Sequence, residues 1–102
     1  MLPFFVYILK CSDGSYYTGH TDNIESRISA HKLGLGCTYT KERLPIEVVY
    51  VQQFASRYEA LSAERQIKGW NRKKKEALMQ VNWDDLVRLS NLRLPIRKLK
   101  EL

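Results

Sequence analysis

The sequence predicts an α+β fold in which helices pack on a small, mostly antiparallel sheet, in the order β-β-α-β-α-α-α. Three observations predict it. Two short strand patterns near the N-terminus are joined by a tight-turn sequence, a third strand pattern lies near the middle of the chain, and helix-capping signals stand on both sides of it. A hairpin whose third strand is reached through a helix is typical of this class.

The first two strands form the predicted hairpin. Residues 4–11 are mostly β-branched or aromatic and too few for a helix, residues 12–15 are a turn signal, and residues 16–18 begin a second strand. Because the first strand is apolar at nearly every position, we expect both of its faces to be covered.

Two registers are open for this hairpin. With a two-residue loop, Tyr7 and Tyr17 point to opposite faces of the sheet. With a three-residue loop that ends at a left-handed Gly14, Tyr7 faces Gly19 and both tyrosines share one face. In this second register Gly19 leaves space beside the Tyr7 ring, where a substrate could approach. The alternative is that the two tyrosines are ordinary sheet aromatics.

The first helix is predicted to begin at residues 22–25, which resemble a capping box with Asp22 as the cap. Gly34 and Gly36 are predicted to end it, because glycine is the usual residue after a helix. A basic loop over residues 37–45 and a third strand over residues 46–54 follow.

Helices fill the rest of the chain. Residues 56–59 are a capping box that opens a helix ended by Gly69. Asn71 can cap a short basic helix that reaches Met79. A last helix is predicted over about residues 83–90.

Length and composition limit the function. The 102 residues suit one domain, predicted over 1–92 with a basic tail over 93–102. Hydrophobic residues make up 44% and charged residues 27%, which excludes a disordered chain. No run approaches the roughly 20 apolar residues that span a bilayer. Cys11 and Cys37 have no metal-ligand spacing; one disulfide is open, but free thiols in a reducing compartment, the cytoplasm, are the simpler interpretation.

The formal net charge of +6 favours a polyanion partner, nucleic acid first, with solubility alone as the alternative. Four cations stand in one block near Trp70: Arg72, Lys73, Lys74 and Lys75. Basic residues close to aromatic ones suit a nucleic-acid groove. A solvated helix face beside a core tryptophan would give the same pattern.

Three side chains on the helices could carry chemistry. Arg27 and His31 lie four apart on a helix face that leans toward the sheet, where arginine can hold a phosphate and histidine can move a proton. Glu64 interrupts or borders an apolar stripe, so its carboxylate must be paired or bind a cation. His20 follows the second strand and could lie nearby. A surface arginine, a rim histidine, a solvated loop histidine and a buried-edge salt bridge are the alternatives.

Five positions occur in one order along the chain: Phe5-Val6-Tyr7, Tyr17-Thr18-Gly19 ten residues later, then Arg27, His31 and Glu64. This pattern resembles the GIY-YIG nuclease superfamily, and most closely its small, single-domain bacterial members. The resemblance spans roughly residues 4–80. It implies a three-stranded antiparallel sheet flanked by helices.

The resemblance also implies cleavage of phosphodiester bonds with one divalent metal ion, usually Mg²⁺ and otherwise Mn²⁺, bound by Glu64. Arg27 would hold the scissile phosphate. Tyr7 and Tyr17 would position or deprotonate the attacking water, and the choice of base between them is open.

Two further positions follow from the resemblance. His31 stands where relatives have tyrosine or histidine, and His20 where some have lysine or histidine. Relatives often add an asparagine to the site, for which Asn71 and Asn82 are the candidates, although both also suit helix caps. The chain has no room for the second domain that usually selects the DNA target, so a partner protein could supply specificity.

We therefore expect a metal-dependent endonuclease that acts on branched, damaged or single-stranded DNA in repair or recombination. Its two phenols, guanidinium and carboxylate should meet in one shallow depression. A catalytically idle nucleic-acid-binding module and a protein–protein adaptor are the alternatives.

Overall fold

The structure is a computed structural model in which residues 3–81 are described. The predicted order of elements is confirmed there, with one short helix added. The elements are β1 (Phe4–Lys10), β2 (Tyr16–Thr21), α1 (Ile24–Lys32), α2 (Thr38–Lys41), β3 (Glu47–Phe54), α3 (Arg57–Lys68) and α4 (Arg72–Val81). The helix predicted over 83–90, Asn82 and the basic tail lie outside the described residues.

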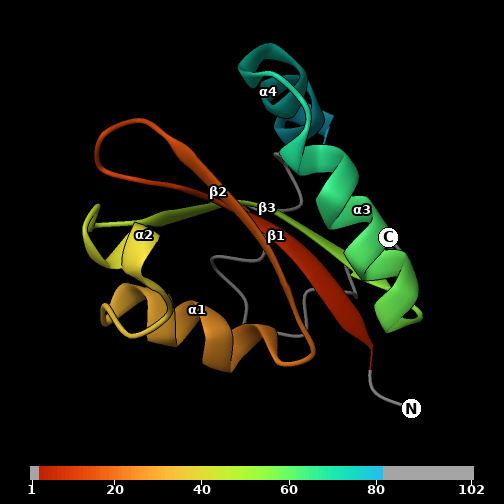
Figure 1. Cartoon of the computed structure of the whole chain (residues 1–102), viewed down its shortest axis with the longest axis horizontal. Helices are drawn as coiled ribbons and strands as arrows, with labels where there is room; N and C mark the ends of the chain where they lie inside the picture. Colours follow the sequence, from red (N-terminus) through yellow and green to blue (C-terminus); the bar gives the residue numbers. More distant parts are fainter. Residues whose placement is uncertain (1–2, 82–102) are drawn as a thin grey trace.

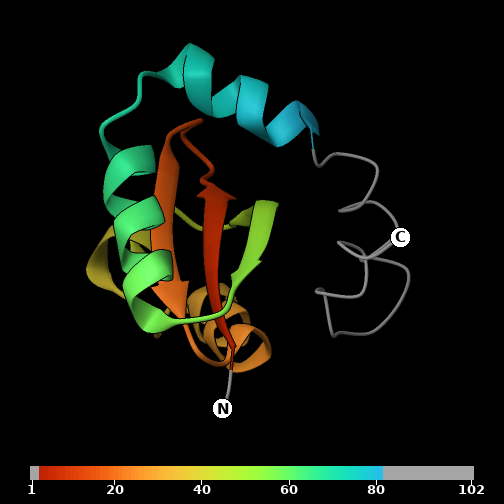
Figure 2. The ribbon, with the colours of Figure 1, turned by 90° about the vertical axis from the view of Figure 1, so that its right-hand side faces the viewer.

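The three strands form one antiparallel sheet in the order β2-β1-β3, which confirms the predicted fold class. The first strand of the chain is therefore the central one. α1 and α2 lie on one side of the sheet and α3 on the other, while α4 crosses near one end of the strands (Figures 1 and 2). Helices cover β1 from both sides, which explains why its residues are apolar at nearly every position.

Alternation along β1 divides the buried residues into two clusters. Phe5, Tyr7 and Leu9 pack with Ile24 of α1 on one side of the sheet. Val6 and Ile8 pack on the other side with residues of α3 and α4, among them Ala60, Ile67 and Met79. Each helix layer thus meets its own set of strand side chains.

The hairpin adopts the three-residue loop. Gly14 has a φ of 87°, its N–H donates to the carbonyl of Cys11 over 2.9 Å, and the N–H of Cys11 donates to the carbonyl of Ser15 over 2.8 Å. Tyr7 consequently lies opposite Gly19. A left-handed residue at the end of a three-residue loop produces this register.

Capping follows the sequence in two helices and shifts by one residue in the third. Ser56 accepts from the N–H of Glu59, and Asn71 accepts from the N–H of Lys74, as predicted. α1 is capped by Asn23, whose Oδ1 accepts from the N–H of Ser26, so the prediction of Asp22 as the cap is wrong. Asparagine and aspartate cap helices about equally well, so residue type alone does not choose between neighbours.

The predicted loop over 37–45 contains the short helix α2, which the sequence analysis missed. Four residues are too few to show a helical pattern. Within residues 3–81, the structure contains no helix with the length and apolar character needed to cross a membrane.

Candidate active site

The paired tyrosines share the face of the sheet that α1 covers. Tyr7 lies opposite Gly19 in the β1–β2 ladder and Tyr17 lies opposite Leu9, so both side chains point to the same side. The two ring centroids are 6.4 Å apart. Of the two registers that the sequence allowed, the structure has the one that brings the phenols together.

The Tyr7 phenol is held between two side chains of α1. Its hydroxyl forms a 2.9 Å hydrogen bond with Nε2 of His31 and accepts one from Nε of Arg27 over 3.4 Å. Residues 27 and 31 stand one helical turn apart, which is why both reach the same phenol. The structure therefore brings Tyr7, Tyr17, Arg27 and His31 into one cluster.

Burial governs the electrostatics of this cluster. Tyr7 is 1% exposed and His31 is fully buried. Burial raises the pKa of Tyr7, and the nearby Arg27 guanidinium only partly offsets that rise. Burial and the charge of Arg27 lower the pKa of His31 below its ordinary value, so the imidazole is neutral at neutral pH. A neutral imidazole offers one donor and one acceptor nitrogen.

Glu64 does not join the phenols. It comes from α3, on the other side of the sheet, where Oε1 is bonded to Nδ1 of His20 and Oε2 lies 2.7 Å from Nζ of Lys68. His20 is paired opposite Val6, so its side chain also faces α3. Glu64 therefore shares no hydrogen bond with the phenols, but its charge adds, after burial, to the rise in the pKa of Tyr7. A single depression that holds all four groups stays a prediction.

The carboxylate of Glu64 is ionised despite its burial. Burial alone would raise its pKa, but hydrogen bonds from Lys68 and His20 outweigh that effect and hold the pKa below its usual value. The salt bridge that was the alternative for Glu64 is therefore present, with Lys68 as its lysine partner.

Two of the predicted nucleic-acid residues have structural partners. Asn71 caps α4, which was the alternative to a place in the nucleic-acid site. Arg72 donates to the carbonyl of Gly14 over 2.8 Å, pairs with Glu76 and lies over the ring of Tyr16, so it ties α4 to the hairpin.

The three lysines that follow vary in their surroundings. Nζ of Lys74 lies 4.9 Å from the centroid of the Trp70 ring, as the interleaving of cations and aromatics suggested. Lys73 is exposed and Lys75 is half-buried, and neither forms an ion pair with another described residue. Their part in binding stays a prediction.

Sequence reasoning missed the α2 side of the cluster. Thr40 is fully buried and its Oγ1 lies 2.8 Å from Nδ1 of His31. Tyr39 stacks on Tyr17 with the ring centroids 5.9 Å apart, and Arg43 lies over the Tyr39 ring. A short loop helix gives no periodic signal, so nothing in the sequence set these residues apart.

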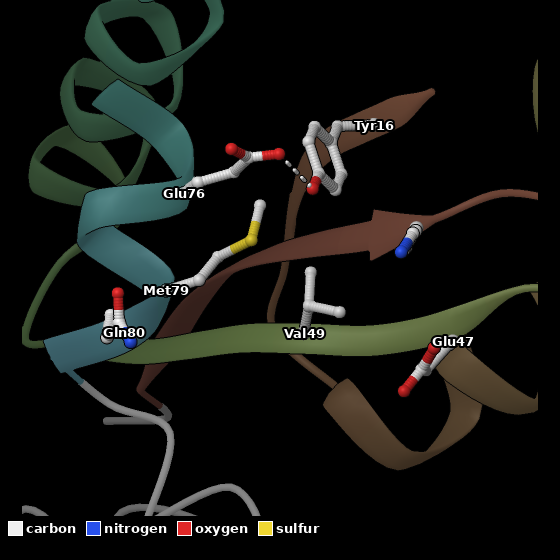
Figure 3. A pocket seen from close by; sticks show the side chains of 7 residues that line it. Tyr16, Glu47, Val49, Glu76, Met79 and Gln80 are labelled. Atoms are coloured by element: carbon white, nitrogen blue, oxygen red, sulfur yellow. Dashed lines mark hydrogen bonds between the residues drawn. The ribbon is translucent and has the colours of Figure 1, made fainter. Parts of the chain in front are cut away.

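A separate groove of about 330 Å³ lies between α4 and one end of the three strands (Figure 3). Tyr16 donates to Glu76 there over 2.9 Å. Its lining includes two carboxylates and one ammonium, and one of the carboxylates, that of Glu76, is paired with Arg72. It is lined by Lys10, Tyr16, Glu47, Val49, Glu76, Met79 and Gln80.

A comparison with known protein families shows to which class the protein belongs. Residues 3–77 match the family described as the GIY-YIG catalytic domain. The chain therefore belongs to the GIY-YIG family, a family of nucleases that generally use divalent metal ions.

The relatives narrow this class to small bacterial proteins named only UPF0213. One from Streptococcus pneumoniae serotype 4 is 44% identical over 78% of this chain and 81% of its own. One from Lacticaseibacillus paracasei is 42% identical over 78% of this chain and 93% of its own. The solution NMR structure of a UPF0213 protein from Bacillus halodurans has a TM-score of 0.57 at 36% identity, covering 91% of this chain and 99% of that one.

Proposed function

We propose that this protein is an endonuclease that hydrolyses DNA phosphodiester bonds with the help of a divalent metal ion. The observation that carries the proposal is the Tyr7 phenol held between an imidazole and a guanidinium. A phenol needs such neighbours to act as a base, because its ordinary pKa of about 10 keeps it protonated at neutral pH.

In the proposed mechanism, Tyr7 is the base that takes a proton from the attacking water. Its own proton passes to Nε2 of His31, 2.9 Å away. Arg27 stabilises the phenolate and, with its remaining N–H groups, the scissile phosphate. Arg27 covers the phenol in the free protein, so we expect the phosphate to draw the guanidinium outward and admit the water. The Tyr17 hydroxyl is hydrogen-bonded to the Cys37 sulfur rather than to an imidazole, and Tyr17 is assigned to positioning.

Glu64 would hold the metal ion. Its carboxylate oxygens are the ligands that Mg²⁺ and Mn²⁺ prefer, but His20 and Lys68 now occupy both of them. No group of three or more His, Cys, Asp or Glu within residues 3–81 could enclose an ion. This donor set fits a weakly held ion that completes its shell with water and substrate phosphate. Once bound, the ion would neutralise charge on the phosphate and acidify water.

The substrate is proposed to be branched, damaged or single-stranded DNA in repair or recombination. The cations of α4 and the net charge of +6 would attract the phosphate backbone without reading sequence. A partner protein could select the target. Cys11 and Cys37 are both free thiols, which suits the reducing cytoplasm as the compartment.

The test is cleavage of supercoiled and branched DNA with Mg²⁺ or Mn²⁺. We expect the wild type to cut, Arg27→Ala and Glu64→Ala to lose cutting, and both variants to keep most of their DNA binding. Glu64→Gln keeps the shape of the side chain, and Glu59→Gln is the matched control, because Glu59 is exposed on the same helix. The control should cut like the wild type.

Two other results would overturn the proposal. Binding with a steep salt dependence but no cutting of any substrate would identify an idle nucleic-acid-binding module. Neither binding nor cutting would leave the adaptor function.

A further inference from the structure

Behind the imidazole that contacts Tyr7 lies a second buried hydroxyl, that of Thr40. Its Oγ1 is 2.8 Å from Nδ1 of His31, while Nε2 on the far side of the ring is 2.9 Å from the Tyr7 hydroxyl. We propose that Thr40 is a positioning residue that keeps the proton of His31 on Nδ1 and so leaves the Nε2 lone pair aimed at Tyr7. The consequence for catalysis rests on the proposed function; the tautomer does not.

The Tyr7 end of this chain of hydrogen bonds favours one tautomer of His31 by donor counting. Nε of Arg27 can only donate, and it donates to the Tyr7 oxygen. The single proton of the phenol then needs an acceptor, and the hydrogen-bonding partner that remains is Nε2 of His31. This bond favours a lone pair on Nε2 and, in a neutral imidazole, a proton on Nδ1. It does not fix the tautomer alone, because the phenol oxygen can accept a second hydrogen bond, and the contribution of Thr40 is therefore needed.

The Thr40 end gives the same answer independently. The Thr40 hydroxyl donates toward Cys37, the residue before α2, whose carbonyl oxygen lies 3.4 Å away and whose sulfur lies 3.5 Å away. With its proton used there, Oγ1 can only accept from His31, so Nδ1 must be the donor. The hydrogen bonds of Tyr7 and Thr40 therefore indicate the same tautomer of His31. In a neutral imidazole, a nitrogen that donates leaves the other nitrogen as the acceptor.

Packing holds the His31 ring in this orientation. A Cβ built on Gly36 would stand 2.7 Å from both Cγ and Cε1 of His31, so the glycine backbone lies flat against the imidazole. The Tyr7 ring meets it nearly edge-on, with the centroids 5.6 Å apart. His31, Thr40 and Tyr7 are all at most 1% exposed, so water cannot replace any of these partners.

The tautomer can be measured without DNA by NMR of the two imidazole nitrogens in ¹⁵N-labelled protein at about pH 7.5, where His31 is neutral. The chain has only two histidines, so a His20→Asn variant assigns the spectrum. We expect the Nδ1-protonated pattern for His31 in the wild type. Thr40→Val keeps the shape of the side chain without its hydroxyl and should move the proton toward Nε2. Thr40→Ser should restore the wild-type pattern.

Thr38→Val is the matched control, because Thr38 is exposed on the same short helix and should leave the His31 signals unchanged. Far-UV circular dichroism checks that each variant folds. An Nε2-protonated wild type, or a Thr40→Val spectrum like that of the wild type, would overturn the inference.

Cleavage separates this inference from the proposed function. If the wild type cuts DNA, Thr40→Val should lower kcat by about tenfold or more with little change in KM, since general-base catalysis as a whole contributes roughly 10²–10⁴-fold. Thr40→Ser should recover most of the rate. If the wild type does not cut, the proposed function fails while the NMR result still decides the role of Thr40.

Discussion

The backbone of Gly19 lies against the phenol of Tyr7, its partner across the β1–β2 ladder. A Cβ built on Gly19 would stand 2.6 Å from the Tyr7 hydroxyl oxygen and 2.7 Å from Cζ. The Tyr7 ring thus occupies the space that the missing side chain leaves. The space beside Gly19 was predicted to admit substrate, but in the structure it accommodates the Tyr7 ring, the catalytic candidate itself.

Gly19→Ala should therefore displace Tyr7. The ring is 1% exposed and fixed by His31 and Arg27, so it cannot yield without losing hydrogen bonds. Overpacking of this kind costs about 1–3 kcal/mol. We expect that loss in the free energy of unfolding measured with urea, and a strong loss of DNA cleavage.

The matched control is Gly69→Ala. Its nearest neighbour would be a backbone oxygen 3.6 Å away, and Gly69 is already in a right-handed conformation, so stability should change by less than about 0.5 kcal/mol. Equal effects at the two glycines would show that close approach to Tyr7 is not what Gly19 provides.

The hydroxyl of Tyr7 should matter more than that of Tyr17. Tyr7→Phe removes the shared partner of His31 and Arg27 and leaves the buried Nε2 unsatisfied, which costs about 1–3 kcal/mol. Cleavage should disappear with it. Tyr17→Phe should retain measurable cutting, because the proposed mechanism assigns Tyr17 to positioning and Tyr7 to deprotonation. Single-turnover cleavage rates decide, and a larger loss in Tyr17→Phe would make Tyr17 the base.

Local patterns were sufficient for the strands and most helix starts but not for the contacts between them. The three-residue loop could not be chosen from residues 12–14, since Gly14 fits either turn. The choice is made by packing: only the observed register puts both Tyr7 and Tyr17 under α1, and a slip of one residue would turn one of them to the α3 side of the sheet.

The candidate site, too, could be predicted from the sequence only in part. Spacing of four residues on one helix was enough to pair Arg27 with His31. It could not show that the sheet separates them from Glu64, because that depends on which face α3 covers. Thr40 could not be predicted for a different reason. A single hydroxyl residue in a predicted loop forms no sequence pattern, and its contact with the buried His31 ring appears only in the structure.

Acid should destabilise the protein in two stages. The folded pKa of His31 is lowered, so the unfolded chain binds more protons and stability falls as the pH drops below about 6.5 toward the folded value. The folded pKa of Glu64 is also lowered, so its contribution is present above the unfolded value of about 4.3 and is lost as the pH falls below it.

Urea unfolding at a series of pH values checks both stages. His31→Gln should flatten the slope of stability against pH in the first stage and leave the second. Glu64→Gln should do the reverse. If His31→Gln left the first slope intact, the buried imidazole would not be its source.

Among the cations of α4, we expect Arg72 to stabilise the fold and Lys73 to bind DNA. Arg72→Ala removes the bond to the Gly14 carbonyl and the contact with the Tyr16 ring, which should cost about 1 kcal/mol in urea unfolding, because the guanidinium is partly exposed. Lys73→Ala removes an exposed ammonium, so stability should not change. Its effect should appear in DNA binding: a weaker affinity across sequences and a salt slope reduced by about 1. The reverse result, with Lys73 needed for stability and Arg72 only for binding, would contradict the assignment of Arg72 as the tie between α4 and the hairpin.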